Sequence, residues 1–225
     1  MLRKILFPLI LGVAGSGVLV SLGLWQVERL AWKEGILADI NSRLSAAPVP
    51  LSLDVTEAAD EYTRVTLTGI PTGEELHVLV SGTEAGTGYR VISKVDTPLG
   101  PILVDQGLLA LDAKQAAPLS APMEITGTLL WPDDQNSNTP APDLAANIWF
   151  ARNIDTMSAS LETLPLMVVT TTTVPADPRL TPLPVNTATI KNDHFEYAVT
   201  WFLLALVWAI MTLFLIARTI RPKDA

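Results

Sequence analysis

The chain contains no cysteine and only two histidines, His77 and His194, among its 225 residues. The absence of cysteine excludes disulfide bonds and thiolate ligands for a metal. It also excludes a covalently attached c-type haem, which needs a Cys-x-x-Cys-His motif. The two imidazoles are therefore the only strong neutral metal ligands that this chain offers.

Positive charge is also scarce. Fifteen basic and 23 acidic residues give a formal net charge of −8. Five of the basic residues and one acid lie in the terminal flanks, residues 1–4 and 218–225, which leaves 10 basic and 22 acidic residues between them. Phosphate binding needs a basic face, so nucleic acid is not expected as a partner.

Charge is missing altogether from two apolar runs, residues 5–25 and 198–217. A helix of about 20 such residues crosses a hydrocarbon core of about 30 Å, and membrane lipid then surrounds it. No small-residue cleavage site closely follows the first run, so we expect an uncleaved signal anchor. The basic flanks predict that both termini are cytoplasmic. The predicted location is the bacterial inner membrane, with the mitochondrial inner membrane as the alternative.

The middle of the chain alternates between β-prone runs and turn formers. The predicted fold class is an α+β membrane protein in which two transmembrane helices flank a β-rich extracytoplasmic domain. The predicted parts are a cytoplasmic N-terminus (1–4), the first span (5–26), the external domain (27–197), the second span (198–217) and a cytoplasmic C-terminus (218–225). Inside the external domain we expect strands near residues 62–69, 75–80, 89–95, 102–109, 123–130 and 166–174, and one amphipathic helix within 153–164. Four prolines in residues 174–184 predict an irregular return to the membrane.

His194 lies at the mouth of the second apolar run, where Tyr197 and Trp201 share its helical face. A ring nitrogen at this position is a candidate ligand for a membrane cofactor. The competing interpretation is structural: Asp193 and Glu196 form a capping box, and His194 is one residue of an interfacial belt.

Five residues at the end of the first apolar run and just after it also have two interpretations. Trp25, Arg29 and Trp32 share one helical face, and Gln26, Arg29 and Lys33 share another. Tryptophan and basic residues commonly lie at the level of the lipid headgroups. Alternatively, Arg29 and Lys33 pair with carboxylates of a ligand held between the two helices.

Small residues are frequent in the first span, including the pairs Gly12/Ser16 and Gly17/Ser21. Such pairs permit close approach of a second helix. The alternative is an apolar groove on the glycine side that accepts a lipid-like tail.

The sequence offers no catalytic constellation. It has no cysteine nucleophile, no serine with a plausible base nearby and no phosphate-cradling glycine loop between a strand and a helix. His77 lies in a β-prone run without a second ligand at useful spacing, and we interpret it as structural. We therefore expect a protein that is not an enzyme, with a membrane-tethered hydrolase as the weaker alternative.

Two segments resemble the end signatures of the Surfeit locus protein (Surf/Shy) family of cytochrome c oxidase assembly factors. They are Trp25-Gln26-x-x-Arg29-x-x-Trp32-Lys33 and Asn192-x-His194-x-x-Tyr197-Ala198-x-Thr200-Trp201-Phe202. Three internal blocks are similar and stand in the same order: Gly86-x-Gly88-Tyr89-Arg90-Val91-Ile92, Ile102-Leu103-Val104 with Gly107, and Trp149-Phe150-x-Arg152. The resemblance extends over about residues 22–202.

The resemblance implies a respiratory-chain chaperone that binds haem a without a covalent bond and assists its insertion into subunit I of haem–copper oxidases. On this basis His194 is the axial ligand and the metal-binding residue. Arg29 and Lys33 offset the propionates, and Trp25, Tyr197 and Trp201 complete the cofactor site. Haem A synthase is the candidate donor. The alternative is a scaffold or accessory subunit that stabilises the oxidase or its assembly intermediates without touching haem.

The chain departs from the family pattern in the segment Asp105-Gln106-Gly107-Leu108, where the family usually has an Asn-Arg-Gly-Trp-like sequence. Asp193 and Glu196 add negative charge beside the candidate haem site, and Asn153 stands where aspartate is common. These departures suggest a divergent member that serves a particular oxidase, such as a quinol oxidase.

Overall fold

The computed structural model describes residues 2–83, 85–188 and 190–220. The chain divides into two compact units. The first combines the two ends, Met1–Asp39 and Thr187–Ala225, and the second is formed by Ile40–Asn186. Each unit is described below by itself.

The first unit is built on two long helices, α1 (Leu2–Ser45) and α4 (His194–Ile220). Leucine is the commonest residue in both, and it combines good helix formation with an apolar side chain. Both helices are long and apolar enough to cross a membrane. Because α1 is continuous, the predicted first span and the helical segment after it form one helix.

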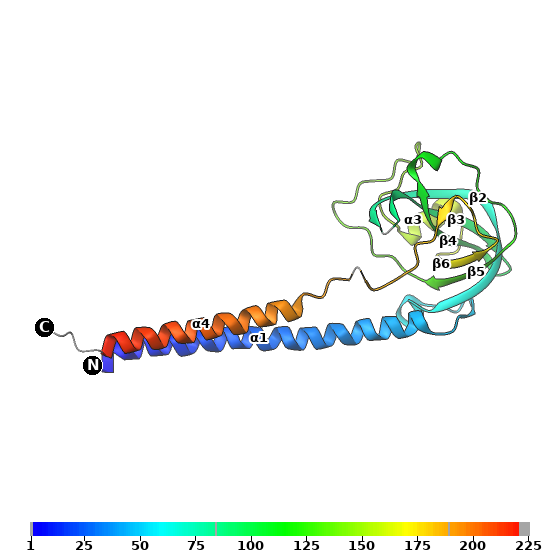
Figure 1. Ribbon diagram of the computed structural model, residues 1–225. Helices are drawn as coiled ribbons and strands as arrows, with labels where there is room; N and C mark the ends of the chain where they lie inside the picture. Colours follow the sequence, from blue (N-terminus) through cyan, green and yellow to red (C-terminus); the bar gives the residue numbers. More distant parts are fainter. Residues whose placement is uncertain (1, 84, 189, 221–225) are drawn as a thin grey trace. The chain divides into compact units, whose positions relative to one another are not determined.

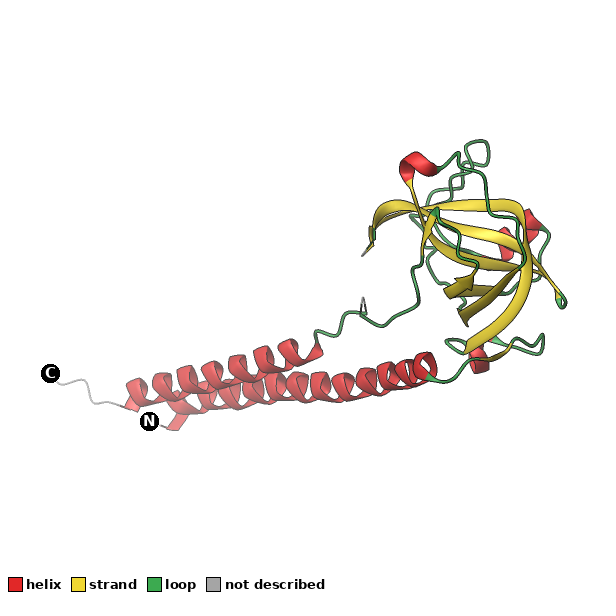
Figure 2. Cartoon of the chain, turned by 45° about the vertical axis from the view of Figure 1, so that its right-hand side comes forward, coloured by secondary structure: helices red, strands yellow, loops and turns green. Residues whose placement is uncertain are grey.

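The two helices lie side by side and antiparallel (Figures 1 and 2). Glycines of α1 face the larger side chains of α4 along the contact. A Cβ on Gly12 would lie 2.1 Å from Thr212, one on Gly15 would lie 2.3 Å from Trp208, and one on Gly23 would lie 2.7 Å from Phe202. The glycine face is therefore used for helix packing. Side chains of α4 occupy the space directly over these three glycines. An apolar groove of about 720 Å³ is lined by Gly12 and Leu11 of α1 and by Met211 of α4, so the helices both pack together and leave a groove beside Gly12.

The second unit contains a five-stranded barrel (Figure 2). Its strands are β2 (Arg64–Thr83), β3 (Gly86–Thr97), β4 (Gly100–Ala110), β5 (Met123–Leu129) and β6 (Met167–Val174). The order is β2-β3-β4-β6-β5, and pairing of β2 with β5 closes the barrel. All of these pairs are antiparallel except β4–β6, which is parallel.

Short elements complete this unit. Strand β1 (Val49–Pro50) pairs with β2, and β7 (Leu180–Thr181) pairs with β4. The helical pieces are α2 (Glu57–Asp60), the 3-10 turn η1 (Leu111–Ala113) and α3 (Ile154–Leu161). The position of α3 agrees with the amphipathic helix expected within residues 153–164. The proline-rich return segment was expected to be irregular, but Leu180 and Thr181 in it form a strand.

The long strand β2 differs from the sequence-based expectation of two separate strands. Its pairing with β3 shifts register between Pro71 and Glu75, and Gly73 within this shift has a φ of +90°. A glycine at positive φ permits a bend without ending the strand. Gly88 precedes the strand expected near residues 89–95 but lies within β3, where a Cβ would approach the Leu109 carbonyl oxygen to 2.3 Å.

Apolar side chains form two cores on opposite faces of the barrel strands. Ile102 and Val104 of β4 belong to the core that fills the barrel, together with Val65, Ile125 and Val168. Leu103 points the other way and packs with Trp149, Met157, Leu161 and Met167 under α3. The helix therefore covers one outer face of the barrel and holds the segment around Trp149 against it.

Candidate functional site

His194 is the first residue of α4, and its ring is tied to α1. Its Nδ1 lies 2.8 Å from Oε1 of Gln26, a residue only 8% exposed. An amide oxygen accepts, so this contact is a hydrogen bond in the tautomer that carries its hydrogen on Nδ1. A neutral imidazole carries one N–H, so Nε2 keeps its lone pair and is the nitrogen free to bind a metal.

Lys33 and Asn192 hold the segment that leads into α4. The Lys33 ammonium donates a hydrogen bond to the backbone carbonyl oxygen of Lys191. The side-chain oxygen of Asn192 is buried and has no hydrogen-bond partner among the residues that the structure describes. A buried acceptor without a donor is costly, so a donor supplied from outside the chain fits this position.

The other residues predicted for the site are exposed or half-buried. Trp25 and Tyr197 are 54% and 55% exposed, whereas Trp201 is half-buried. The Arg29 guanidinium stacks over the ring of Trp32 at 3.7 Å from its centre. The structure thus joins His194 to Gln26, and Lys33 to the start of α4, while Trp25 and Arg29 remain accessible from solvent or lipid.

The donor set fits a haem better than a bare metal ion. The described residues contain no cluster of three or more histidine, cysteine, aspartate or glutamate side chains that could hold a metal. Structural zinc needs four protein ligands and catalytic zinc usually needs three. Haem iron receives four ligands from the porphyrin, so a single imidazole with a free Nε2 is sufficient.

In the barrel unit, the three internal sequence blocks meet at Asp105. This carboxylate is fully buried on β4, and its Oδ2 lies 2.5 Å from Nε of Arg90 and 3.2 Å from Arg152. Arg152 also binds Asp134 at 2.6 Å. Burial lowers the pKa of Arg152, but Asp134 and Asp105 together raise it, so this guanidinium stays charged. The departure from the family pattern at Asp105 therefore supplies the shared partner of two arginines.

A second buried charge cluster surrounds the other histidine. Arg179 binds Glu75 at 2.8 Å and Asp177 at 2.7 Å. Nε2 of His77 lies 3.5 Å from Glu75, a distance too long for good hydrogen-bond geometry, and both ring nitrogens lack a hydrogen-bond partner among the described residues. The His77 ring packs beside Tyr89 instead. The structural role expected for His77 stays a prediction.

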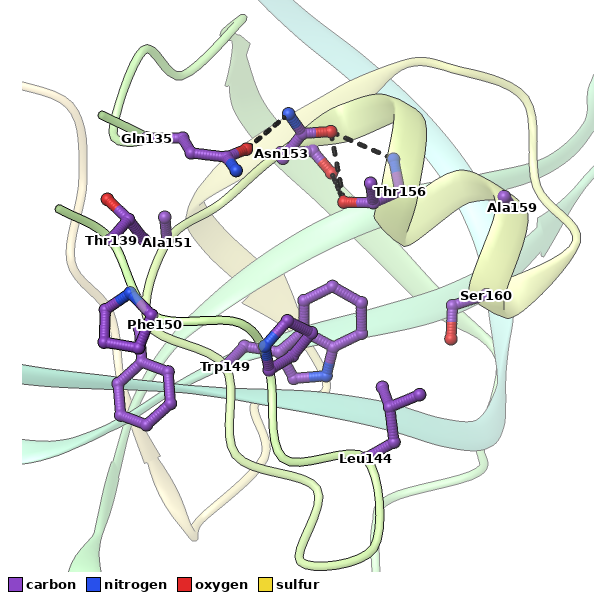
Figure 3. A pocket seen from close by; sticks show the side chains of 12 residues that line it. Gln135, Thr139, Leu144, Trp149, Phe150, Ala151, Asn153, Thr156, Ala159 and Ser160 are labelled. Carbon is purple, nitrogen blue, oxygen red and sulfur yellow. Dashed lines mark hydrogen bonds between the residues drawn. The ribbon is translucent and has the colours of Figure 1, made fainter. Parts of the chain in front are cut away.

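The barrel unit also carries a pocket of about 460 Å³ (Figure 3). Trp149 lies in it with Leu144 and Phe150, and Leu144 is 70% exposed. Asn153 caps α3 by accepting from the Thr156 amide, and its own amide donates to Gln135. The twelve lining residues carry no charge, so the pocket suits a neutral, largely apolar group.

Sequence reasoning did not identify Gln26 as a functional residue. A signal was available, because a polar amide follows directly on an uncharged apolar run, where polar groups need a partner. The partner itself could not be identified, because it lies 168 residues away in the sequence.

Comparison with known proteins identifies the family. The model of the SURF1 family matches residues 14–206. A SURF1-like protein of Drosophila melanogaster is 29% identical over 214 residues, which cover 82% of this chain and 69% of the relative. Human Surfeit locus protein 1 is 27% identical, with 81% and 68% covered.

A bacterial relative matches over more of its own length. The SURF1-like protein of Rickettsia felis is 30% identical over 201 residues, covering 84% of this chain and 88% of the relative. The family model covers the whole barrel unit and part of each long helix. This chain belongs to the SURF1 family.

Proposed function

We propose that this chain is a membrane-anchored assembly factor for haem–copper oxidases, which binds haem a at His194 and assists its insertion into oxidase subunit I. The SURF1 family is known for cytochrome oxidase assembly. The observation that carries the haem assignment is the contact between Nδ1 of His194 and the buried Gln26, which leaves Nε2 available as a ligand. The role is that of a binding protein and not of an enzyme.

The helices are proposed to anchor the chain in a bacterial inner membrane. Both have the length and the apolar composition that a span requires. The basic residues of the two flanks support a cytoplasmic position for the termini and an external position for the barrel unit. His194 and Gln26 then lie at the outer boundary of the membrane, where an amphiphilic cofactor can enter.

When bound, haem a would supply an iron that takes a protein ligand, and two negatively charged propionates. His194 offers Nε2 to the iron, and the exposed Arg29 attracts the propionates. Lys33 is already engaged at the Lys191 carbonyl, so we assign it mainly to ordering the start of α4. Trp25, Tyr197 and Trp201 provide aromatic surface at the rim. A single protein ligand suits transient binding, because subunit I must remove the cofactor.

The scaffold hypothesis is supported by a different observation, the pocket of Figure 3 with its exposed Leu144 and Phe150. Uncharged apolar surface of this kind is typical of the centre of a protein interface. In this hypothesis the barrel unit holds subunit I or haem A synthase, and His194 serves only as a residue of the helix start.

A visible spectrum separates the two hypotheses. The full chain is purified in detergent from cells that make haem A, beside His194→Ala and, as the matched control, His77→Ala. A haem a spectrum in the wild type and in His77→Ala that is lost in His194→Ala, with circular dichroism unchanged, supports the haem-binding function. A wild type without haem that still copurifies with subunit I supports the scaffold. Equal spectra in all three proteins move the ligand away from both histidines.

A further inference from the structure

We infer that Gln26 is the positioning residue of the cofactor site, because it selects the tautomer of His194 that presents Nε2 as the metal-binding atom. The inference rests on the proposed function only in naming the metal as a haem iron. The geometry behind it is the 2.8 Å contact between Gln26 Oε1 and His194 Nδ1, which joins the two helices of the first unit.

The tautomer matters because only one of the two neutral forms can use Nε2 as a ligand. A proton on Nδ1 leaves a lone pair on Nε2, whereas a proton on Nε2 blocks that nitrogen. Free histidine in water exchanges between the two forms. An acceptor fixed beside Nδ1 favours the first form before any metal arrives, which removes an ordering cost from binding.

Because Gln26 is buried, its amide oxygen can favour one tautomer of His194 effectively. Its side chain is 8% exposed, so water competes poorly for Oε1 and the hydrogen bond is stronger than at the surface. The neighbouring contacts fix both partners. Gly23, one turn earlier in α1, lies against Phe202, and Lys33 holds the carbonyl of Lys191 just before His194.

A neutral amide beside His194 also suits a site that must release its cofactor. A carboxylate at this position would pull the Nδ1 proton strongly and make the imidazole a more basic, tighter ligand. A neutral amide orients the ring with less increase in basicity. It also avoids an unpaired charge next to the apolar part of α4. Gln26 therefore orients the His194 ring but leaves its affinity for the cofactor moderate, as delivery to an acceptor protein requires.

The tautomer can be measured without haem. The full chain is labelled with ¹⁵N-histidine in detergent, and long-range ¹H–¹⁵N spectra at about pH 8, where a typical imidazole is neutral, distinguish protonated from unprotonated ring nitrogens. Comparison with His194→Ala identifies the signals of His194. We expect Nδ1–H in the wild type and in Ser21→Leu, an exposed polar-to-leucine control on α1. We expect mixed tautomers in Gln26→Leu.

A wild-type Nε2–H tautomer, or a spectrum unchanged by Gln26→Leu, overturns the inference. Gln26→Glu supplies a second test because it keeps an acceptor at the same reach. Haem affinity should fall about tenfold to a hundredfold in Gln26→Leu, the usual range for loss of a second-shell partner, and should be retained in Gln26→Glu. The iron–histidine stretching band should move to higher frequency in Gln26→Glu than in the wild type. A band that does not move also contradicts the inference.

The two proposals fail separately. If the wild type binds no haem but its tautomer depends on Gln26, the positioning role stands and the haem function falls. If haem binds through His194 while Gln26→Leu changes neither tautomer nor affinity, the function stands and the positioning role falls.

Discussion

Arg90 on β3 donates its Nε hydrogen to Asp105 on β4, with 2.5 Å between Nε and Oδ2. The register partner of Asp105 is Ile92, so Arg90 reaches the carboxylate diagonally from two residues away on the same face. Arg152, from the segment that precedes α3, binds the same oxygen at 3.2 Å. One buried carboxylate thus connects two neighbouring strands to the loop that forms the pocket.

Replacing Asp105 by asparagine should destabilise the protein strongly. The carboxylate is 0% exposed, so the change leaves the partly buried Arg90 without its counter-charge and Arg152 with Asp134 alone. Removing one partner of a buried pair typically costs about 3–5 kcal/mol. The measurement is chemical unfolding of the full chain, with Asp112→Asn as the exposed control. Equal midpoints for the two variants would show that Asp105 is not a structural centre.

Stability should fall with acid because of the cluster around Arg179. Burial raises the pKa of Glu75 and of Asp177, but contacts with Arg179, and with His77 for Glu75, outweigh burial and hold both pKa values below the ordinary 4.5 and 3.8. A lowered folded-state pKa stabilises the protein above the unfolded value and is lost as the pH falls through the folded one. The contribution is thus complete at neutral pH and disappears below about pH 4.

The test of this pH dependence is the unfolding midpoint of the wild type and of Arg179→Leu between pH 7 and about pH 3. The wild type should be more stable at neutral pH, and the difference should shrink as the two carboxylates become protonated. A difference that is constant over this range would contradict the assignment of these groups.

Two glycines of α1 should respond oppositely to the same substitution. Gly15→Ala places a Cβ 2.3 Å from the Trp208 ring, whereas at Gly17 no described atom lies within 4 Å. Alanine favours a helix over glycine by about 1 kcal/mol at either site. We expect Gly15→Ala to lower the thermal midpoint in detergent, with a packing cost of about 1–3 kcal/mol, and Gly17→Ala to leave it unchanged or raise it. A neutral Gly15→Ala would mean that the helices separate easily.

Arg29 should contribute to binding of the haem propionates and not to binding of the iron. Its guanidinium is exposed and stacked on Trp32, so it can reach a carboxylate near the site. Arg29→Ala should weaken the binding of haem by a factor of about 1.5 to 5, as expected for an exposed ion pair. Binding of the haem dimethyl ester, which lacks the charges, should not change. Equal losses for both ligands would assign Arg29 to packing.

Substitutions in the pocket should affect stability differently for buried and for exposed residues. Trp149 is 5% exposed and packs in the core under α3, so Trp149→Ala should cost about 3–5 kcal/mol of stability. Leu144 is 70% exposed, and Leu144→Ser should leave the unfolding midpoint unchanged. If the scaffold hypothesis holds, Leu144→Ser lowers copurification of subunit I without altering any haem spectrum. Unchanged copurification in this folded variant would argue against the pocket as an interface.

Much of the secondary structure could be predicted because its signals are local. The two apolar runs exceed the length of a bilayer core, and the structure forms α1 and α4 over them. Alternation such as Val65-Thr66-Leu67 indicated strands, and β3 to β6 lie where the runs were expected. The helix start at His194 follows directly on Asp193, as the capping pattern predicted.

The contacts that define the candidate site could not be predicted because they depend on distant parts of the chain. Nothing local to Gln26 indicates His194, and nothing local to Asp105 indicates Arg152. The bend at Gly73 was missed for a related reason: a glycine between two apolar runs is typical of a turn, and only pairing with β3 shows that the strand continues. The two-residue strands β1 and β7 are too short to have a periodicity of their own.

The contact between Gln26 and His194 has a consequence for how the protein is made. Every strand of the barrel is encoded before His194, so the ribosome completes the whole barrel sequence while the site still has only its first half. A premature stop anywhere between β7 and α4 yields a chain that has all its strands but lacks His194, the proposed metal ligand. Antibodies against the barrel would detect such a product as readily as the intact protein. Loss of the last helix would therefore remove the proposed ligand while leaving every strand of the barrel in the chain.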